Sequence, residues 1–200
     1  MAWGKSWCAL ALAAVVVASP AQAQFSDGYK FLEAVKKKDG VKVTDMLNEP
    51  GTTVINSRDI TSGQGALHVV TARRDVTWIR FLTAKGANPN ARDKQGVTPL
   101  VVASRLGFIE GVDALIEAGA KVDEANDTGE TPLIAAVHAR SPEMMQTLLK
   151  AGADPDRPDN SGRSARDYAQ LEGSDFLHTI DKFAKPKAER ARTATYGPKF

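Results

Sequence analysis

Cysteine is almost absent from this chain of 200 residues, which has a single one, Cys8. One thiol cannot form an internal disulfide or a cysteine-rich metal site, so a folded domain must be held together by its hydrophobic core. Because Cys8 lies in an N-terminal segment that we expect to be removed, a cysteine nucleophile is not expected either.

Histidine is also scarce, with three residues, and the charges nearly balance at a formal net charge of +2. No two of His68, His138 and His178 have the i, i+4 spacing that places metal ligands on one helix face. Nucleic-acid binding needs a basic stripe, and the central part of the chain mixes both signs. We therefore predict neither a metal centre nor binding to nucleic acid.

Motifs for catalysis or cofactor binding are missing. The glycines form neither GxGxxG nor GxxxxGK[ST], the loops that hold phosphates. Serine and aspartate gather at turns and helix starts, where their backbone hydrogen bonds account for them. Calcium at Ser57-Arg58-Asp59 or Asp154-Pro155-Asp156 is a weaker alternative. We expect no cofactor and no enzyme, with hydrolytic or metal-dependent catalysis as the less favoured alternative.

Long hydrophobic runs are missing except for 11 residues at 8–18. This run follows Lys5 and precedes Ala21-Gln22-Ala23, which is the order of a cleavable secretory signal. As a helix it would span roughly 16 Å, about half of a bilayer core, so a membrane anchor is the weaker alternative. Residues 1–23 are predicted to be a signal peptide cleaved before Gln24, which sends the chain to the periplasm or, alternatively, out of the cell.

What the chain does contain is a repeat of 33 residues. Three sets of residues keep this spacing: Gly63, Gly96, Gly129 and Gly162; Gly86, Gly119 and Gly152; Leu67, Leu100 and Leu133. A fixed period of this size means one supersecondary unit stacked on copies of itself. The sequence therefore predicts a stack that offers an extended surface rather than a pocket.

The copy at 93–122 shows how each unit is expected to fold. After a turn at Gly96, Thr98-Pro99 starts a short inner helix, because Thr caps the first N–H groups and Pro fits the first helical position. Gly107 ends this helix, and Gly119 caps the next one in the left-handed conformation. The outer helix has one apolar face, made by Ile109, Val112, Leu115 and Ile116. No copy buries enough apolar surface alone, so neighbouring faces must close on each other.

Both ends of the array are irregular, as terminal repeats are. The predicted repeat domain covers residues 24–183, with a cap at 25–57, full repeats at 58–90, 91–123 and 124–156, and a second cap at 157–183. Residues 184–200 are rich in Lys and Arg without an apolar period, and are predicted to be a disordered basic tail. The alternative for this tail is an electrostatic arm for an acidic partner or a membrane surface.

The turn, the Thr-Pro pair, the apolar helix faces and the capping Gly-Ala recur in the order of the ankyrin repeat, which the chain resembles from about residue 25 to 183. The resemblance implies an all-α solenoid of helix–turn–helix pairs with β-turn fingers. Only the first copy has the histidine of this family, His68, whereas Val101 and Ile134 stand at the later positions. We therefore expect fewer of the cross-repeat hydrogen bonds that this histidine makes.

The resemblance also implies that fingers and inner helices form a concave surface that binds another protein. The expected finger positions are Thr61, Ser62, Gln64, Lys94, Gln95, Val97, Asp127, Thr128, Glu130, Asn160, Ser161 and Arg163. The expected inner-helix positions are Ala72, Arg73, Arg105, Leu106, His138 and Ala139. Val97 and Leu106 are apolar where the fold is not expected to need them, and the arginines among these positions would attract an acidic partner. The alternative is a solvated face without a specific partner.

We therefore predict a monomeric, non-enzymatic module that binds a partner protein in the periplasm and does not insert stably into a membrane. The alternative is a structural or accessory protein that stabilises an envelope or stress-response enzyme through its outer face or its basic tail.

Overall fold

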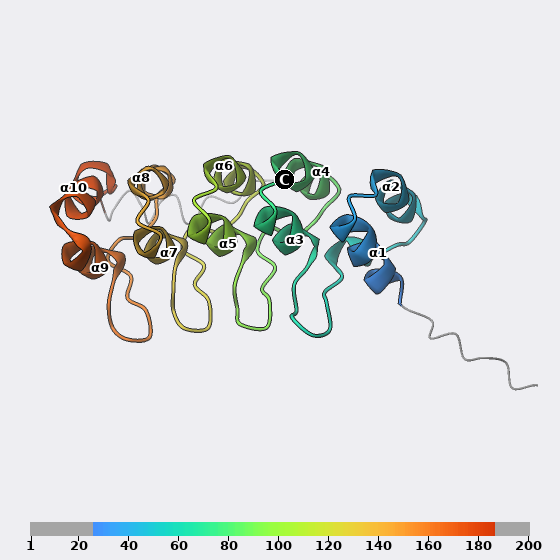
Figure 1. Cartoon of the computed structure of the whole chain (residues 1–200), viewed down its shortest axis with the longest axis horizontal. Coiled ribbons are helices and arrows are strands. Elements are labelled where there is room, and N and C mark those ends of the chain that lie inside the picture. The colour runs from blue at the N-terminus through green and yellow to red at the C-terminus, as the bar shows by residue number, and fades with distance from the viewer. Residues whose placement is uncertain (1–25, 187–200) are drawn as a thin grey trace, which may run out of the picture.

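Two rows of helices run side by side along the molecule, with hairpin loops projecting from one side (Figure 1). The computed structural model describes residues 26–186. The inner row holds α1 (Asp27–Lys36), α3 (Ala66–Ala72), α5 (Pro99–Arg105), α7 (Pro132–His138) and α9 (Ala165–Glu172). The outer row holds α2 (Gly40–Asn48), α4 (Val76–Ala84), α6 (Ile109–Glu117), α8 (Pro142–Lys150) and α10 (Ser174–Phe183), with a 3-10 turn, η1 (Val54–Asn56), after α2. The predicted fold class, an all-α solenoid of helix pairs with fingers, is confirmed.

Local sequence explains where the inner helices begin. The hydroxyl of Thr98 accepts from the N–H of Val101 at 3.3 Å, and Thr131 caps α7 in the same way. Proline occupies the first position of both helices, where its missing N–H costs nothing. In α3 the cap is Gly65, which has no side chain, and the ring of His68 accepts from the Gly65 N–H instead.

A residue in the left-handed conformation separates the two helices of each of the first four pairs. It is glycine only at Gly107, with φ +63°, and a basic residue at Lys38, Arg74 and Arg140. The three basic side chains reach into the next repeat. Lys38 contacts Asp75, Arg74 donates to the carbonyl of Leu106, and Arg140 contacts Glu172. These contacts offset the strain of a left-handed backbone in a residue with a Cβ.

One apolar core runs between the two rows. Leu67, Leu100 and Leu133 stand at equivalent places and are at most 2% exposed. Each inner helix packs against the next one along the row, as α3 does against α5 and α5 against α7. The roughly 1.5–3 kcal/mol from burying each large aliphatic side chain therefore depends on the neighbouring repeat.

The predicted signal peptide and the part of the predicted tail beyond Pro186 lie outside the described residues. Across residues 26–186, no helix combines the length and the apolar character needed to cross a bilayer.

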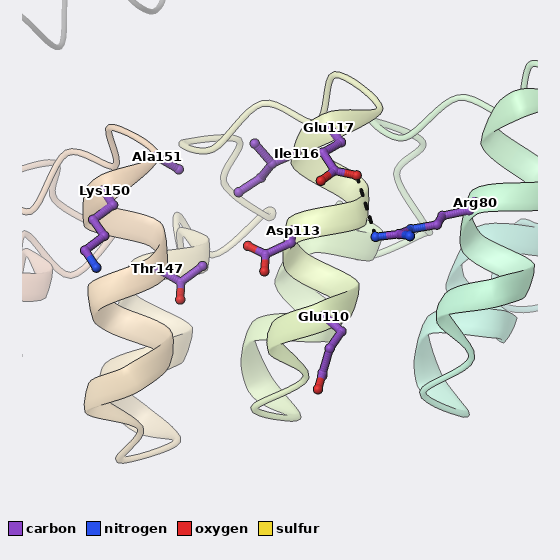
Figure 2. A pocket seen from close by; sticks show the side chains of 8 residues that line it. All are labelled: Arg80, Glu110, Asp113, Ile116, Glu117, Thr147, Lys150 and Ala151. Carbon is purple, nitrogen blue, oxygen red and sulfur yellow. Dashed lines mark ion pairs between the residues drawn. The ribbon is translucent and has the colours of Figure 1, made fainter.

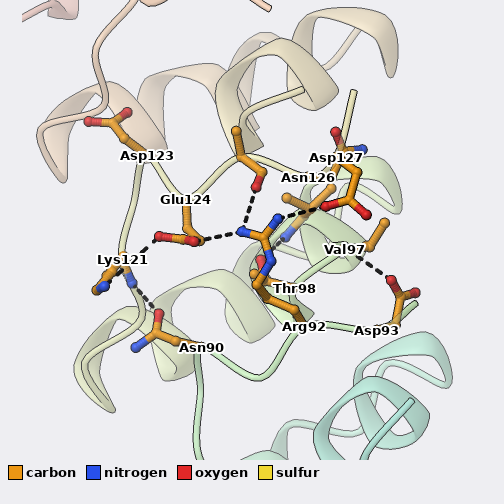
Figure 3. Close-up of polar contacts among 12 residues, drawn as sticks. Asn90, Arg92, Asp93, Val97, Thr98, Lys121, Asp123, Glu124, Asn126 and Asp127 are labelled. Carbon is orange, nitrogen blue, oxygen red and sulfur yellow. Dashed lines mark hydrogen bonds and ion pairs between the residues drawn. The ribbon is translucent and has the colours of Figure 1, made fainter. Parts of the chain in front are cut away.

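Asparagine side chains link the loops on the outer side of neighbouring repeats. The amide of Asn90 accepts from the N–H of Lys121 at 2.8 Å (Figure 3). It also donates to the carbonyl of Gly119 at 3.0 Å. The residue 33 positions later is Asp123, whose carboxylate accepts from the N–H of Asp154 at 2.8 Å. The carbonyl of Gly152 is equivalent to that of Gly119, but the carboxylate of Asp123 has no hydrogen to donate to it. The second hydrogen bond that Asn90 makes is therefore missing at this junction.

Asp123→Asn is therefore expected to raise the free energy of unfolding by about 1 kcal/mol, because an amide adds a donor for the Gly152 carbonyl. The reciprocal variant, Asn90→Asp, removes such a donor and is expected to lower it by a similar amount. Urea unfolding followed by circular dichroism measures both changes. Destabilisation by Asp123→Asn would contradict the equivalence of the two junctions.

Candidate protein-binding surface

Each finger is a turn closed by its own backbone. The N–H of Asp93 donates to the carbonyl of Val97 at 2.9 Å, and Asn126 and Asp159 close the next two fingers in the same way. The side-chain oxygen of this first residue also accepts from N–H groups inside the turn, as Asp93 does from Gln95 and Val97 at 2.9 Å. The residues at the tips are therefore held in defined positions.

Neighbouring fingers are joined to each other by backbone hydrogen bonds. The donors are Lys94, Asp127 and Asn160, and the acceptors are the carbonyls of Ser62, Gln95 and Thr128, at 3.0, 3.0 and 3.1 Å. The 33-residue period thus appears as a regular series of bonds from one fingertip to the next. Such a series reduces the ordering cost that a binding surface must meet when a partner arrives.

Arg92 strengthens the junction between the second and third fingers (Figure 3). Its guanidinium donates to Glu124 at 2.7 Å, to the carbonyl of Ala125 at 2.9 Å and to Asp127 at 3.0 Å. The hydrogen bond to Asp127, together with that to Glu124, holds the pKa of Arg92 above its usual value. Asp127 is exposed, but one of its carboxylate oxygens already accepts a hydrogen bond from Arg92.

The last finger is closed by a strongly acidic carboxyl group. Burial raises the pKa of Asp159, but hydrogen bonds outweigh this effect and lower the pKa to about 2. They come from the hydroxyls of Ser161 and Tyr168, at 2.7 Å each, and from the N–H groups of Ser161 and Arg163. This carboxylate therefore stays charged except in strong acid.

Most of the predicted binding positions are exposed along the fingers and inner helices. The exposed ones are Gln64, Lys94, Gln95, Arg105, Asp127, Thr128, His138, Asn160, Ser161 and Arg163. We call these ten residues the finger surface. Within residues 26–186, no hydrogen bond or ion pair is found for the side chains of Gln64, Lys94 and Gln95, so these three are uncommitted.

The prediction that Val97 and Leu106 are apolar without a structural need is wrong. Val97 is only 4% exposed and packs with Val101 and Ala135 in a small apolar cluster. Leu106 is partly buried against the main core. Both side chains serve packing between repeats, which removes Val97 from the accessible surface.

The prediction that three arginines give a freely available positive surface also needs correction. The Arg73 side chain is 18% exposed, donates to the carbonyl of Val35 at 2.5 Å and lies 3.3 Å from Asp75. Arg105 is exposed but pairs with Glu130, whose side chain is 15% exposed and is therefore structural. Of these three arginines, only Arg163 is exposed and has no ion pair with a carboxylate of residues 26–186; its guanidinium lies over the ring of Tyr168.

Sequence reasoning missed two exposed apolar residues beside this surface. Leu171 is 73% exposed and continues the 33-residue register of Arg105 and His138, so the period itself could have identified it. Ile60 is 87% exposed in the first finger. In this finger Gly63 follows Asp59 by four positions, whereas in the later fingers the glycine follows the first residue by three. The first finger is therefore one residue longer, and this insertion could have indicated an exposed side chain.

A hollow of about 230 Å³ lies between α1 and the first finger. Its apolar part is formed by Leu32 and Val69, and its polar part by Lys36, Asp59, Thr61, Ser62 and Gln64. Lys36 is paired with Glu33 at 3.0 Å. Gln64 thus joins the finger surface to a small concavity.

The described residues contain no group of three or more His, Cys, Asp or Glu side chains placed to hold a metal ion. His138 is exposed at the end of α7 and lies against the ring of Tyr168, with ring centroids 4.6 Å apart. This arrangement is a ring contact on the surface.

Comparison with protein families agrees with this geometry. A family model described as ankyrin repeats (3 copies) matches residues 31–126, and one described as ankyrin repeats (many copies) matches residues 115–169. Together the two matches run without a gap from residue 31 to residue 169. The chain belongs to the ankyrin repeat family, whose members are generic protein–protein interaction modules and typically not enzymes.

Proposed function

We propose that this chain is a non-enzymatic binding module that is exported by residues 1–23 and holds a partner protein on its finger surface in the periplasm. The observation that supports binding is the series of backbone bonds from finger to finger, which fixes the exposed and uncommitted Gln64, Lys94 and Gln95 in space. Specific protein interfaces cover about 800 Å² on each partner, so several fingers and inner helices must take part together.

The charge-reversal test must avoid residues that hold the stack together. Arg73→Glu would break contacts with Val35 and Asp75, so a loss of binding would not distinguish recognition from unfolding. Lys94 and Arg163 are both exposed and lie on different fingers. They are therefore the better pair.

The variant Lys94→Glu/Arg163→Glu is expected to bind a captured partner about tenfold more weakly, since two exposed charges contribute about 1.4 kcal/mol together. The matched control is Lys42→Glu/Lys85→Glu, which makes the same charge change at exposed positions on the outer row. The partner is identified by cross-linking in the envelope fraction, and its Kd is then measured with each purified variant. Equal Kd values for both variants would overturn the assignment of binding to the finger surface.

Export is tested separately from binding. The chain purified from the periplasmic fraction is expected to begin at Gln24, because Ala21-Gln22-Ala23 fits the cleavage site of a secretory signal. N-terminal sequencing checks this result, and deletion of residues 2–23 is expected to leave the chain in the cytoplasm. A chain recovered only from the cytoplasm, with residues 1–23 still attached, would contradict the export proposal.

A further inference from the structure

The outer row of helices carries a groove that is separate from the finger surface (Figure 2). Side chains of α4, α6 and α8 line an open hollow of about 550 Å³. Helix α6 contributes the carboxylates of Glu110, Asp113 and Glu117, together with the apolar side chain of Ile116. We call this region the outer groove. It presents a mainly acidic face of α6, with one basic residue on either side, Arg80 from α4 and Lys150 from α8.

The negative charge of the outer groove is only partly balanced by the described residues. Glu117 lies 3.8 Å from Arg80, and Figure 2 shows the two side chains pointing toward each other. Asp113 points toward α8 in the same view. Within residues 26–186, neither Glu110 nor Asp113 has a hydrogen bond or ion pair through its side chain. Like charges at i, i+3 on one helix repel, so a cation bound between them would be favourable.

The chain leaves the stack close to this groove. Helix α10 packs against α8, and the Nζ of Lys150, which lines the groove, lies 5.3 Å from the centre of the Phe183 ring at the end of α10. The residues that follow Pro186 are strongly basic. They include Lys187, Arg190, Arg192 and Lys199 against a single acidic residue, Glu189. A segment of the opposite charge therefore starts beside the edge of the outer groove.

We propose that residues 187–200 bind in the outer groove of their own chain, with Arg190 and Arg192 at the carboxylates of Glu110 and Asp113. Arg190 is seven residues past Phe183, and an extended chain of that length reaches about 23 Å. Neighbouring packed helices are only about 8–10 Å apart, so the segment can cross α8 and reach α6.

The attachment of the segment to the stack makes weak charge pairs sufficient. A link of only a few residues gives the tethered segment an effective concentration in the millimolar range. Exposed ion pairs that would not hold a free peptide can therefore hold this one. The groove and the finger surface lie on different sides of the helix rows, so this proposal is independent of the proposed partner binding.

Paramagnetic relaxation in the full chain tests the proposal. A nitroxide is attached to Tyr196→Cys in the Cys8→Ser background, and amide signals are recorded with the label oxidised and reduced. At low salt, the oxidised label is expected to remove most of the signal from α6 and α8. The signal is expected to return at about 0.5 M salt, where charges are screened within about 4–5 Å. Unchanged signals in α6 and α8, or losses confined to the fingers, would overturn the proposal.

Two variants with equal charge change separate this groove from general electrostatics. Glu110→Lys/Asp113→Lys is expected to abolish the effect, whereas Asp45→Lys/Glu49→Lys, at exposed positions on and beside α2, is expected to preserve it. Equal loss of the effect in both variants would refute specific binding in the outer groove.

A mixture of labelled chains and isotope-enriched unlabelled chains tests whether the segment binds a second copy. Signal losses in the enriched chains would show that the outer groove binds the segment of a second copy, and would overturn binding within one chain. The salt series uses the parent sequence at α6, so the test does not depend on the folding of any groove variant.

Discussion

Gly129→Ala is expected to lower the free energy of unfolding by about 3 kcal/mol. Gly129 has φ +83°, a conformation that costs a residue with a Cβ roughly 1–2 kcal/mol. A Cβ at this position would also lie 2.6 Å from the backbone nitrogen of Asn160. This nitrogen donates to Thr128 in the bond between the third and fourth fingers, so the fourth finger must move away and lose that bond.

Gly162 provides a matched control for this prediction. It also has φ +83°, but no atom lies within 4 Å of the place where its Cβ would be. Gly162→Ala is therefore expected to cost only the conformational part, roughly 1–2 kcal/mol. Urea unfolding of both variants, followed by circular dichroism, measures the difference. Equal losses would show that the contact between fingers contributes nothing to stability.

The architecture could be predicted because its signals are local. Gly96, Gly107 and Gly119 adopt positive φ where the sequence places turns and helix ends, and Thr98-Pro99 begins α5 as expected. The order of units then follows from the period of 33 residues. A stack whose repeats contact only their neighbours needs no further topological information.

The side chains of the candidate surface were harder to predict because their partners come from other repeats. Val97 looks like a free fingertip residue within its own copy, and it is the next copy that covers it, through Ala135 of α7. Arg73 reaches Val35, 38 residues earlier, and a long flexible side chain gives no local sign of such a contact. Register shows which residues share a face, but it does not show which long side chains are already paired.

His68→Ala is expected to lower the free energy of unfolding by about 2–4 kcal/mol, because the buried Gly65 N–H loses its partner and the Val97 carbonyl keeps only its hydrogen bond from Asp93. The N–H of Gly65 donates to Nδ1 of His68 at 3.2 Å, and Nε2 donates to the carbonyl of Val97 at 2.9 Å. These two bonds require the neutral ring with its proton on Nε2. The ring caps α3 and also joins the first finger to the second. Val101 and Ile134, at the later equivalent positions, have no polar atoms in their side chains and cannot make such bonds.

The same contacts make this junction sensitive to acid. Burial, which disfavours the charged ring, lowers the pKa of His68, and the hydrogen bond to Val97 and the charge of Asp93 only partly oppose this effect. Because the pKa in the folded chain is below the unfolded value of about 6.5, the unfolded chain binds the proton more tightly. The stabilisation is therefore fully present above about pH 6.5 and is lost as the pH falls through the lower, folded pKa.

The free energy of unfolding of the parent chain is accordingly expected to fall between about pH 7 and pH 5, and His68→Ala is expected to reduce this slope. His138→Ala, which changes an exposed ring on the finger surface, leaves His68 intact and is expected to keep the slope that His68 produces. Urea unfolding at several pH values measures all three chains. An unchanged slope in His68→Ala would mean that the neutral ring does not couple the first two repeats. A reduced slope together with a large loss at pH 7.5 would show that the neutral imidazole of His68 stabilises the junction between the first two fingers.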